Sequence, residues 1–196
     1  IKHFDLRLGN KCNLKCRMCS PMNSSLIEEE YLQNRAALNG YYFQSNSQVT
    51  DWCETEMFDQ NFNSQINNVH TLYMTGGEPT VIKKNYDILQ RLIDSGRSQE
   101  ITVMINTNLV SYNPKFYDLM RQFGSVIVQA SIDAVGHLAS YIRYPSNFDT
   151  IDKNLQQLVA LEGNISIKAT CALQSLNLNR LPELFEYLEA FNRQAN

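Results

Sequence analysis

The sequence predicts an α/β fold built around a parallel sheet, and three observations support this prediction. Short apolar segments alternate five times with segments of helical period, as in repeated strand–helix units. No two-residue hairpin turn joins neighbouring apolar segments, so consecutive strands are expected to run in the same direction. Unusual polar or glycine-rich motifs follow four of the strands, at the end where parallel βα folds place their active sites.

The first part of the chain predicts one strand and two helices. Residues 3–8 alternate apolar and polar side chains as a strand does, and residues 24–38 have the pattern of a helix that a serine can cap. The polar, aromatic stretch at 39–53 is expected to be an inserted loop. A second helix is expected at 54–67.

The middle of the chain continues the alternation. Residues 69–74 form a short apolar strand, and the helix expected at 82–95 is followed by a glycine that ends it. Residues 101–105 are the third strand. Pro114 lies in the first turn of the helix expected at 114–123, where proline is well tolerated.

The last part of the chain completes the pattern. A fourth strand is expected at 126–132, and the helix near 148–162 has apolar residues at helical spacing. The fifth strand is expected at 165–173 and the last helix at 180–193. We therefore expect residues 1–196 to form a single domain. Because the alternation ends on a helix, a closing sixth strand can be missing.

Composition places the chain among ordinary globular proteins. Hydrophobic residues make up 43% and charged residues 19% of the 196 residues, and the net charge is −3. This charge gives no reason to expect DNA binding, and the apolar runs are too short to cross a membrane. No signal peptide is visible and there is no initiator methionine, so a fragment or processed chain is expected. Three of the five cysteines are crowded together, which favours a reducing, cytoplasmic location.

The crowded cysteines are Cys12, Cys16 and Cys19, with the spacing C-x3-C-x2-C. Three thiolates this close can bind three corners of an iron–sulfur cluster and leave the fourth iron free. Structural zinc and inert thiols are the alternatives, but structural zinc usually takes four ligands. No other cysteine or histidine lies at a short zinc-finger spacing. We expect Cys53 and Cys171 to be structural, with Cys171 a buried thiol of the fifth strand.

Three further motifs follow the later strands. In Gly76-Gly77-Glu78-Pro79, the glycines let backbone approach a ligand, and a carboxylate on this turn could pair with an ammonium group. The other two place short hydrogen-bonding side chains at strand ends, in Asn106-Thr107-Asn108 and in Ser131-Ile132-Asp133. Ordinary turn chemistry is the alternative for each. Arg143 could bind a carboxylate, or could be a plain surface arginine.

Together these motifs resemble those of the radical S-adenosylmethionine (radical SAM) enzymes. The cysteine motif after the first strand and Gly-Gly-Glu-Pro after the second carry the resemblance, which covers nearly the whole chain. It implies an open (β/α)6 partial TIM barrel. The later motifs look most like the branch with a SPASM or twitch extension, although no cysteine-rich C-terminal segment is present.

The resemblance also implies roles for individual residues. Cys12, Cys16 and Cys19 would hold a [4Fe–4S] cluster whose open iron binds the amino and carboxylate groups of S-adenosylmethionine. Around that cofactor, the implied contacts are Gly76, Gly77 and Glu78 for the ammonium, Ser131 and Arg143 for the carboxylate, Thr107, Asn108 and Asp133 for the ribose, and Met18 and Leu173 for the adenine. Many relatives have an aromatic residue at the position of Met18, and glycine at the position of Leu109.

The implied activity is radical chemistry. An electron donor such as flavodoxin or ferredoxin would reduce the cluster, and cleavage of S-adenosylmethionine would give a 5′-deoxyadenosyl radical that takes a hydrogen atom from a substrate. A peptide or protein is the first expectation for that substrate. The alternatives are activation of a glycyl-radical enzyme, modification of tRNA or a nucleotide, and a non-catalytic metal-binding module on the same scaffold.

Overall fold

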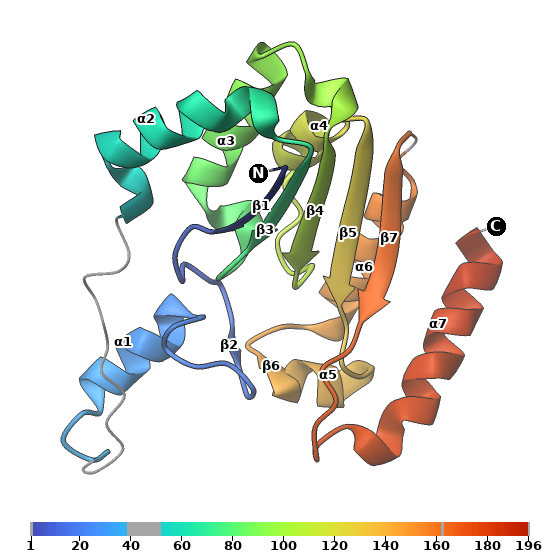
Figure 1. The fold of residues 1–196 in the computed structure, drawn as a ribbon. Coiled ribbons are helices and arrows are strands. Elements are labelled where there is room, and N and C mark those ends of the chain that lie inside the picture. The colour runs from blue at the N-terminus through green and yellow to red at the C-terminus, as the bar shows by residue number, and fades with distance from the viewer. Residues whose placement is uncertain (1, 39–51, 162, 196) are drawn as a thin grey trace.

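The structure, a computed structural model, describes residues 2–38, 52–161 and 163–195 (Figure 1). Most of the inserted loop expected at 39–53 lies outside the described residues. Its last two residues belong to a short 3-10 turn at Trp52–Glu54. The other expected elements can all be compared with the structure.

Five parallel strands form the sheet, as the sequence predicts. In spatial order they are β1 (His3–Arg7), β3 (Thr71–Thr75), β4 (Thr102–Thr107), β5 (Ser125–Ser131) and β7 (Ile165–Thr170). Every neighbouring pair in this sheet is parallel. The α/β fold class and the parallel sheet are therefore confirmed, and the layout is that of a partial TIM barrel.

Seven α-helices connect or flank the strands in the described residues. They are α1 (Ser25–Gln33), α2 (Glu56–Gln65), α3 (Lys83–Asp94), α4 (Pro114–Met120), α5 (Gly136–Ile142), α6 (Phe148–Val159) and α7 (Leu181–Ala195). In Figure 1 the strands point toward α1 and α5, so these two short helices lie at the carboxyl ends of the strands. None of the helices in the described ranges combines the length and the apolar character that a membrane span requires.

The core lies between one face of the sheet and its helices. Alternate strand residues on this face, such as Leu72, Val103 and Val126, have no solvent exposure. They belong to the same apolar cluster as Ile88 of α3 and Phe116 of α4. The strand residues between them are mostly only partly covered, because side chains alternate between the two faces of a strand. The sheet therefore has one buried face and one open face.

Three short elements were not predicted. Strands β2 (Lys15–Cys16) and β6 (Arg143–Tyr144) pair in antiparallel fashion, and α5 has only seven residues. Segments this short contain too few residues for a hydrophobic period to appear. The helix expected at 24–38 was also wrong in length, because α1 ends at Gln33. Residues 34–37 are exposed, so they bury no apolar face that could sustain a helix.

Candidate active site

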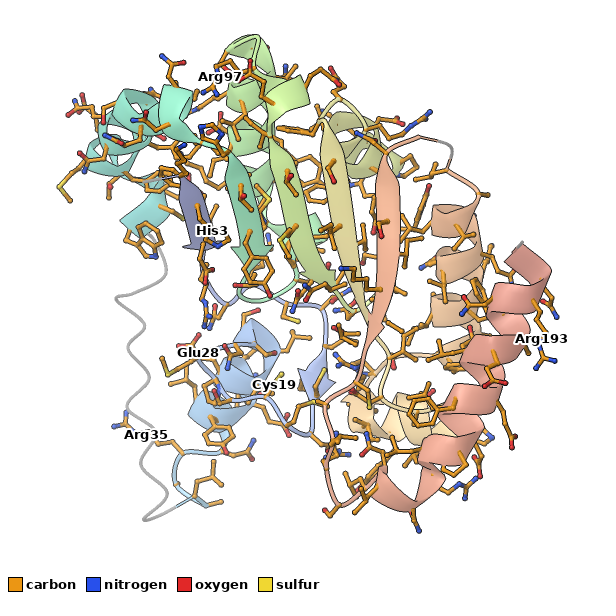
Figure 2. The ribbon with its side chains drawn as sticks, turned by 45° about the vertical axis from the view of Figure 1, so that its right-hand side comes forward. His3, Cys19, Glu28, Arg35, Arg97 and Arg193 are labelled. Carbon is orange, nitrogen blue, oxygen red and sulfur yellow. The ribbon has the colours of Figure 1, made fainter. Side chains whose placement is uncertain are left out.

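The three motif cysteines lie on the loop that leaves the carboxyl end of β1. Cys16 is in β2 and is 5% exposed, whereas Cys12 and Cys19 are partly buried. Figure 2 shows Cys19 beyond the carboxyl ends of the strands. Helix α1 holds this loop through its first residues. The Ser24 hydroxyl donates to the Leu14 carbonyl at 2.6 Å, and the Cys12 amide donates to the Ser25 hydroxyl at 3.2 Å.

The turn after β3 lies directly against the cysteine loop. The Gly77 amide donates to the Gly9 carbonyl at 3.1 Å, and the Glu78 amide donates to the Lys11 carbonyl at 2.9 Å. A Cβ atom on Gly77 would lie 2.0 Å from the Lys11 oxygen, and one on Gly76 would lie 2.6 Å from the Gly9 oxygen. The two glycines thus allow a close backbone approach. In this structure the approaching group is the cysteine loop.

Glu78 stabilises the same turn with its side chain. Its carboxylate is buried and accepts hydrogen bonds from the Thr80 hydroxyl and amide, at 2.8 and 3.3 Å. It also accepts from the Thr107 hydroxyl and the Asn108 amide, both at 2.8 Å. The carboxylate therefore joins the ends of β3 and β4. Its expected pairing with a ligand ammonium stays a prediction.

A pH titration of stability should report on Glu78. Burial raises the pKa of its carboxyl above the ordinary 4.5, despite the hydrogen bonds that work to lower it. The folded state therefore binds this proton more tightly than the unfolded state, so its contribution to stability is full below about pH 4.5 and falls as the pH rises through the folded pKa. We expect the wild type to lose stability relative to Glu78→Gln over that window, by at most about 1.4 kcal/mol per pH unit. Urea unfolding at several pH values measures this difference, and a gain by the wild type would contradict it.

Asn13, which lies between two of the cysteines, was missed in the sequence. Its side-chain oxygen accepts from the Asn108 amide group at 2.7 Å, and its own amide group donates to the Ser111 hydroxyl at 2.9 Å. These two hydrogen bonds therefore connect the cysteine loop to the segment after β4. Asparagine is common in loops, so its sequence position alone could not reveal this bridge.

Asp133 and Arg143 form a buried ion pair behind the cysteine loop. Arg143 Nε lies 2.7 Å from Asp133 Oδ2, although the two atoms lie outside hydrogen-bond geometry. Asp133 Oδ1 accepts from the Ala172 amide at 2.8 Å, and Arg143 Nη1 lies 4.0 Å from Cys16 Sγ. The pair thus connects the ends of β5 and β7 to the cysteine loop and places a cation beside one of its thiols.

The three thiols influence one another's ionisation. The hydrogen bond from Cys16 lowers the pKa of Cys19 to about 7, and Arg143 acts in the same direction. The same hydrogen bond, together with burial, raises the pKa of Cys16, and burial raises that of Cys12. The hydrogen bond and Arg143 thus favour the thiolate at Cys19, and thiolate is the form that binds metal.

The remaining predicted residues lie around the same rim. Ser131 ends β5 and is partly exposed, Met18 is 38% exposed on the cysteine loop, and Leu173 is 67% exposed beyond β7. Cys53 is buried, as expected. The expectation for Cys171 was wrong, because this residue lies just after β7 and is exposed. The apolar pattern predicted a strand longer than the one that forms.

Asn177 was also missed. This fully buried side chain donates to the backbone carbonyls of Asp133 and Ala172, both at 3.0 Å. It holds together the segment that carries Asp133, the partner of Arg143, and the segment that carries Ala172, which donates to Asp133. The isolated asparagine in a polar stretch gave no signal of this role.

The three cysteine thiols have the donor chemistry that an iron–sulfur cluster requires. In the described residues, no three histidine, cysteine, aspartate or glutamate side chains are grouped as ligands of one metal ion. An iron–sulfur cluster distributes its protein ligands over different irons, so its cysteines need not converge on one point. Three thiols on one loop, with Arg143 beside Cys16 to offset negative charge, form a donor set that fits such a cluster.

Comparison with known proteins agrees with this geometry. The family model described as the radical SAM superfamily matches residues 6–188. The chain belongs to the radical SAM superfamily. The matched region contains all three motif cysteines and the glycine turn, so the motifs identified in the sequence lie within the part of the chain that matches the family.

Individual relatives are more distant. The chain is 24% identical over 200 residues to the protein MJ0907 of Methanocaldococcus jannaschii. This alignment covers 97% of this chain and 59% of that protein. Similar solved structures include SuiB of Streptococcus suis bound to S-adenosylmethionine, with a TM-score of 0.58, 15% identity and coverage of 95% of this chain and 38% of that one. Native anSMEcpe with bound AdoMet gives a TM-score of 0.62, 14% identity and coverage of 96% and 48%. This radical SAM chain therefore spans from about a third to three fifths of the length of these relatives, and the likeness to the solved structures is one of fold.

Proposed function

We propose that the chain is the core domain, residues 1–196, of a radical SAM enzyme that cleaves S-adenosylmethionine reductively. The observation that carries this proposal is the cysteine loop, which lies at the carboxyl ends of the strands and is joined by backbone hydrogen bonds to the glycine turn. Membership of the superfamily supports it. Similar folds were solved with S-adenosylmethionine or AdoMet bound.

In this proposal Cys12, Cys16 and Cys19 hold a [4Fe–4S] cluster. When bound, the cluster would supply the single electron that breaks a carbon–sulfur bond of S-adenosylmethionine, and flavodoxin or ferredoxin is the proposed donor. The chain's own contribution is to fix the loop. Asn13 and the amides of Gly77 and Glu78 hold it in place, while Arg143 balances charge at Cys16.

The hydrogen-bond pattern divides the proposed cofactor residues into supporting and contacting groups. Glu78, Thr107, Asn108 and Asp133 already bond to other protein groups, so we assign them first to shaping the pocket that receives the methionine ammonium and the ribose. Arg143 is shared between Asp133 and the cofactor carboxylate. The side chains with polar or apolar surface still available at the rim, Ser131, Met18 and Leu173, are assigned to direct contact.

For the substrate we propose a peptide or protein. SuiB bound to its precursor peptide SuiA is one of the similar structures, with a TM-score of 0.55, 18% identity and coverage of 95% of this chain and 36% of that one. The later strand-end motifs, which look like those of the SPASM or twitch branch, point to the same class of substrate.

The proposal is tested by turnover of the cofactor. The natural full-length protein is first reconstituted anaerobically with iron and sulfide. When dithionite and S-adenosylmethionine are then added, it is expected to release 5′-deoxyadenosine and methionine in equal amounts. Chromatography of the products measures both. Because dithionite replaces the natural donor, a missing partner protein cannot explain a negative result. Absence of both products from a chain with a full complement of iron would contradict the proposal.

A further inference from the structure

The open face of the sheet lies directly beside the cysteine loop. Helices α6 and α7 cover the other face at β7, where Ile165, Ile167 and Ala169 line a cavity of about 270 Å³ together with apolar residues of both helices. By alternation, Ser166, Lys168 and Thr170 lie on the open face. Figure 2 shows side chains standing on the strands on this face, with no described helix laid across them.

A polar row crosses this face just below the rim. Asn106 of β4 is in register with Gln129 of β5, and Gln129 is in register with Lys168 of β7. Asn106 directly precedes Thr107, which bonds to Glu78, and Gln129 lies two residues before Ser131. Asn106 and Gln129 therefore lie within two residues of Thr107 and Ser131, which belong to the proposed cofactor site.

The groups in this row have unused hydrogen-bonding capacity. The Asn106 side-chain oxygen accepts from the Tyr73 hydroxyl at 3.0 Å. In the described ranges, neither the Asn106 amide nitrogen, nor the Gln129 side chain, nor the Lys168 ammonium has a hydrogen-bond or ion-pair partner. A ligand here would meet two amide groups, which donate and accept, and a single cation at the β7 end.

The length and chemistry of the row favour a peptide. Adjacent strands lie about 4.8 Å apart, so three strands span about 10 Å, the length of about three residues of extended chain. Side-chain amides match the paired donor and acceptor of peptide groups. Nucleotide-binding surfaces commonly stack bases on aromatic rings. The three residues of the row are non-aromatic, and the neighbouring Tyr73 directs its hydroxyl to the Asn106 oxygen.

We propose that Asn106, Gln129 and Lys168 form a substrate subsite that binds an extended peptide segment with an aspartate or glutamate side chain at the β7 end. This inference extends the proposed function and rests on it, because a peptide bound at the row would lie beside the site where the radical is proposed to form. Lys168 selects the charge, and the two amides align the peptide backbone.

The test compares short end-blocked peptides that differ only in a central Glu, Gln or Lys. Binding is measured by NMR chemical-shift titration of the apo chain, without iron or reductant. The Glu peptide is expected to bind about two- to fivefold more tightly than the Gln peptide, since one exposed ion pair contributes at most about 1 kcal/mol. Lys168→Glu should reverse the order, so that the Lys peptide binds best. Lys168→Gln, a milder change, should remove the preference.

Lys153→Glu is the matched control, because it makes the same charge change on the exposed surface of α6, a helix on the other face of the sheet. It should leave the preference for the Glu peptide unchanged. Equal binding of all three peptides to the wild type, preference for an oligonucleotide of similar length, or loss of preference in the Lys153 variant would overturn the proposal. Each of these outcomes can occur in a chain that still cleaves S-adenosylmethionine, so failure of the subsite and failure of the proposed function are distinguishable.

Discussion

Alanine at Cys12, Cys16 or Cys19 is expected to abolish cluster binding. Each substitution removes one of three thiolate ligands, and no other cysteine lies on the same loop to replace it. The wild type reconstituted without oxygen is expected to hold about four irons per chain, as one [4Fe–4S] cluster does. Each variant should fall to near zero. Iron and sulfide analysis, together with the visible absorbance of the cluster, measures the change.

Cys171→Ala provides the control for the three cysteine variants. This thiol is exposed and lies outside the cysteine loop, so its removal should leave the iron content unchanged. Circular dichroism of the apo variants separates loss of a ligand from loss of the fold. Full iron content in a Cys16→Ala chain would be incompatible with ligation by the triplet. Zinc retained after aerobic purification, without affinity for S-adenosylmethionine, would instead support the metal-binding module.

Gly77→Ala is expected to destabilise the chain by about 3 kcal/mol. Its Cβ would lie 2.0 Å from the Lys11 carbonyl oxygen, so the backbone of one loop must move. Overpacking of this kind typically costs about 1–3 kcal/mol. The displacement also weakens the two hydrogen bonds between the turn and the cysteine loop, each worth about 1 kcal/mol. Urea unfolding of the apo protein measures the loss of free energy.

Gly136→Ala serves as the comparison for this variant. Gly136 has a φ of +57° but no atom within 4 Å of an added Cβ, so only backbone strain of about 1–2 kcal/mol is expected. The two variants should also differ in cluster binding, since only the Gly77 change displaces the cysteine loop. Similar losses of stability, together with full iron content in Gly77→Ala, would show that the loops do not depend on their close contact.

The sheet was predictable from the sequence because each strand carries its own local signal. The strands expected at 69–74 and 126–132 are short apolar runs that can be recognised from a few residues, and parallel strands bring their carboxyl ends to one edge. The grouping of the cysteine loop, the glycine turn and Asp133 at that edge followed from this rule. Which end of the sheet carries the site therefore needed no knowledge of distant contacts.

The hydrogen bonds and ion pairs within the site could not be predicted in the same way. Glu78 is held by donors that lie up to 30 residues away along the chain, and any of them could have been an ordinary turn residue. Strand β2 pairs with β6 through two residues on each side, too few for a periodic pattern. The ion pair of Asp133 with Arg143 depends on α5, whose seven residues carried no recognisable period.

The pairing of Cys16 with Arg143 has a consequence for the order of assembly. These residues are 127 positions apart, and the cysteine loop also rests on segments near Gly77 and Asn108. During synthesis the three thiols are made before the segments that fix their positions, and Arg143 follows Cys16 by 127 residues. Contacts of such large sequence separation form late in folding. If the cysteines hold the proposed cluster, we therefore expect it to be inserted after the sheet has folded, with the cysteines kept reduced until then.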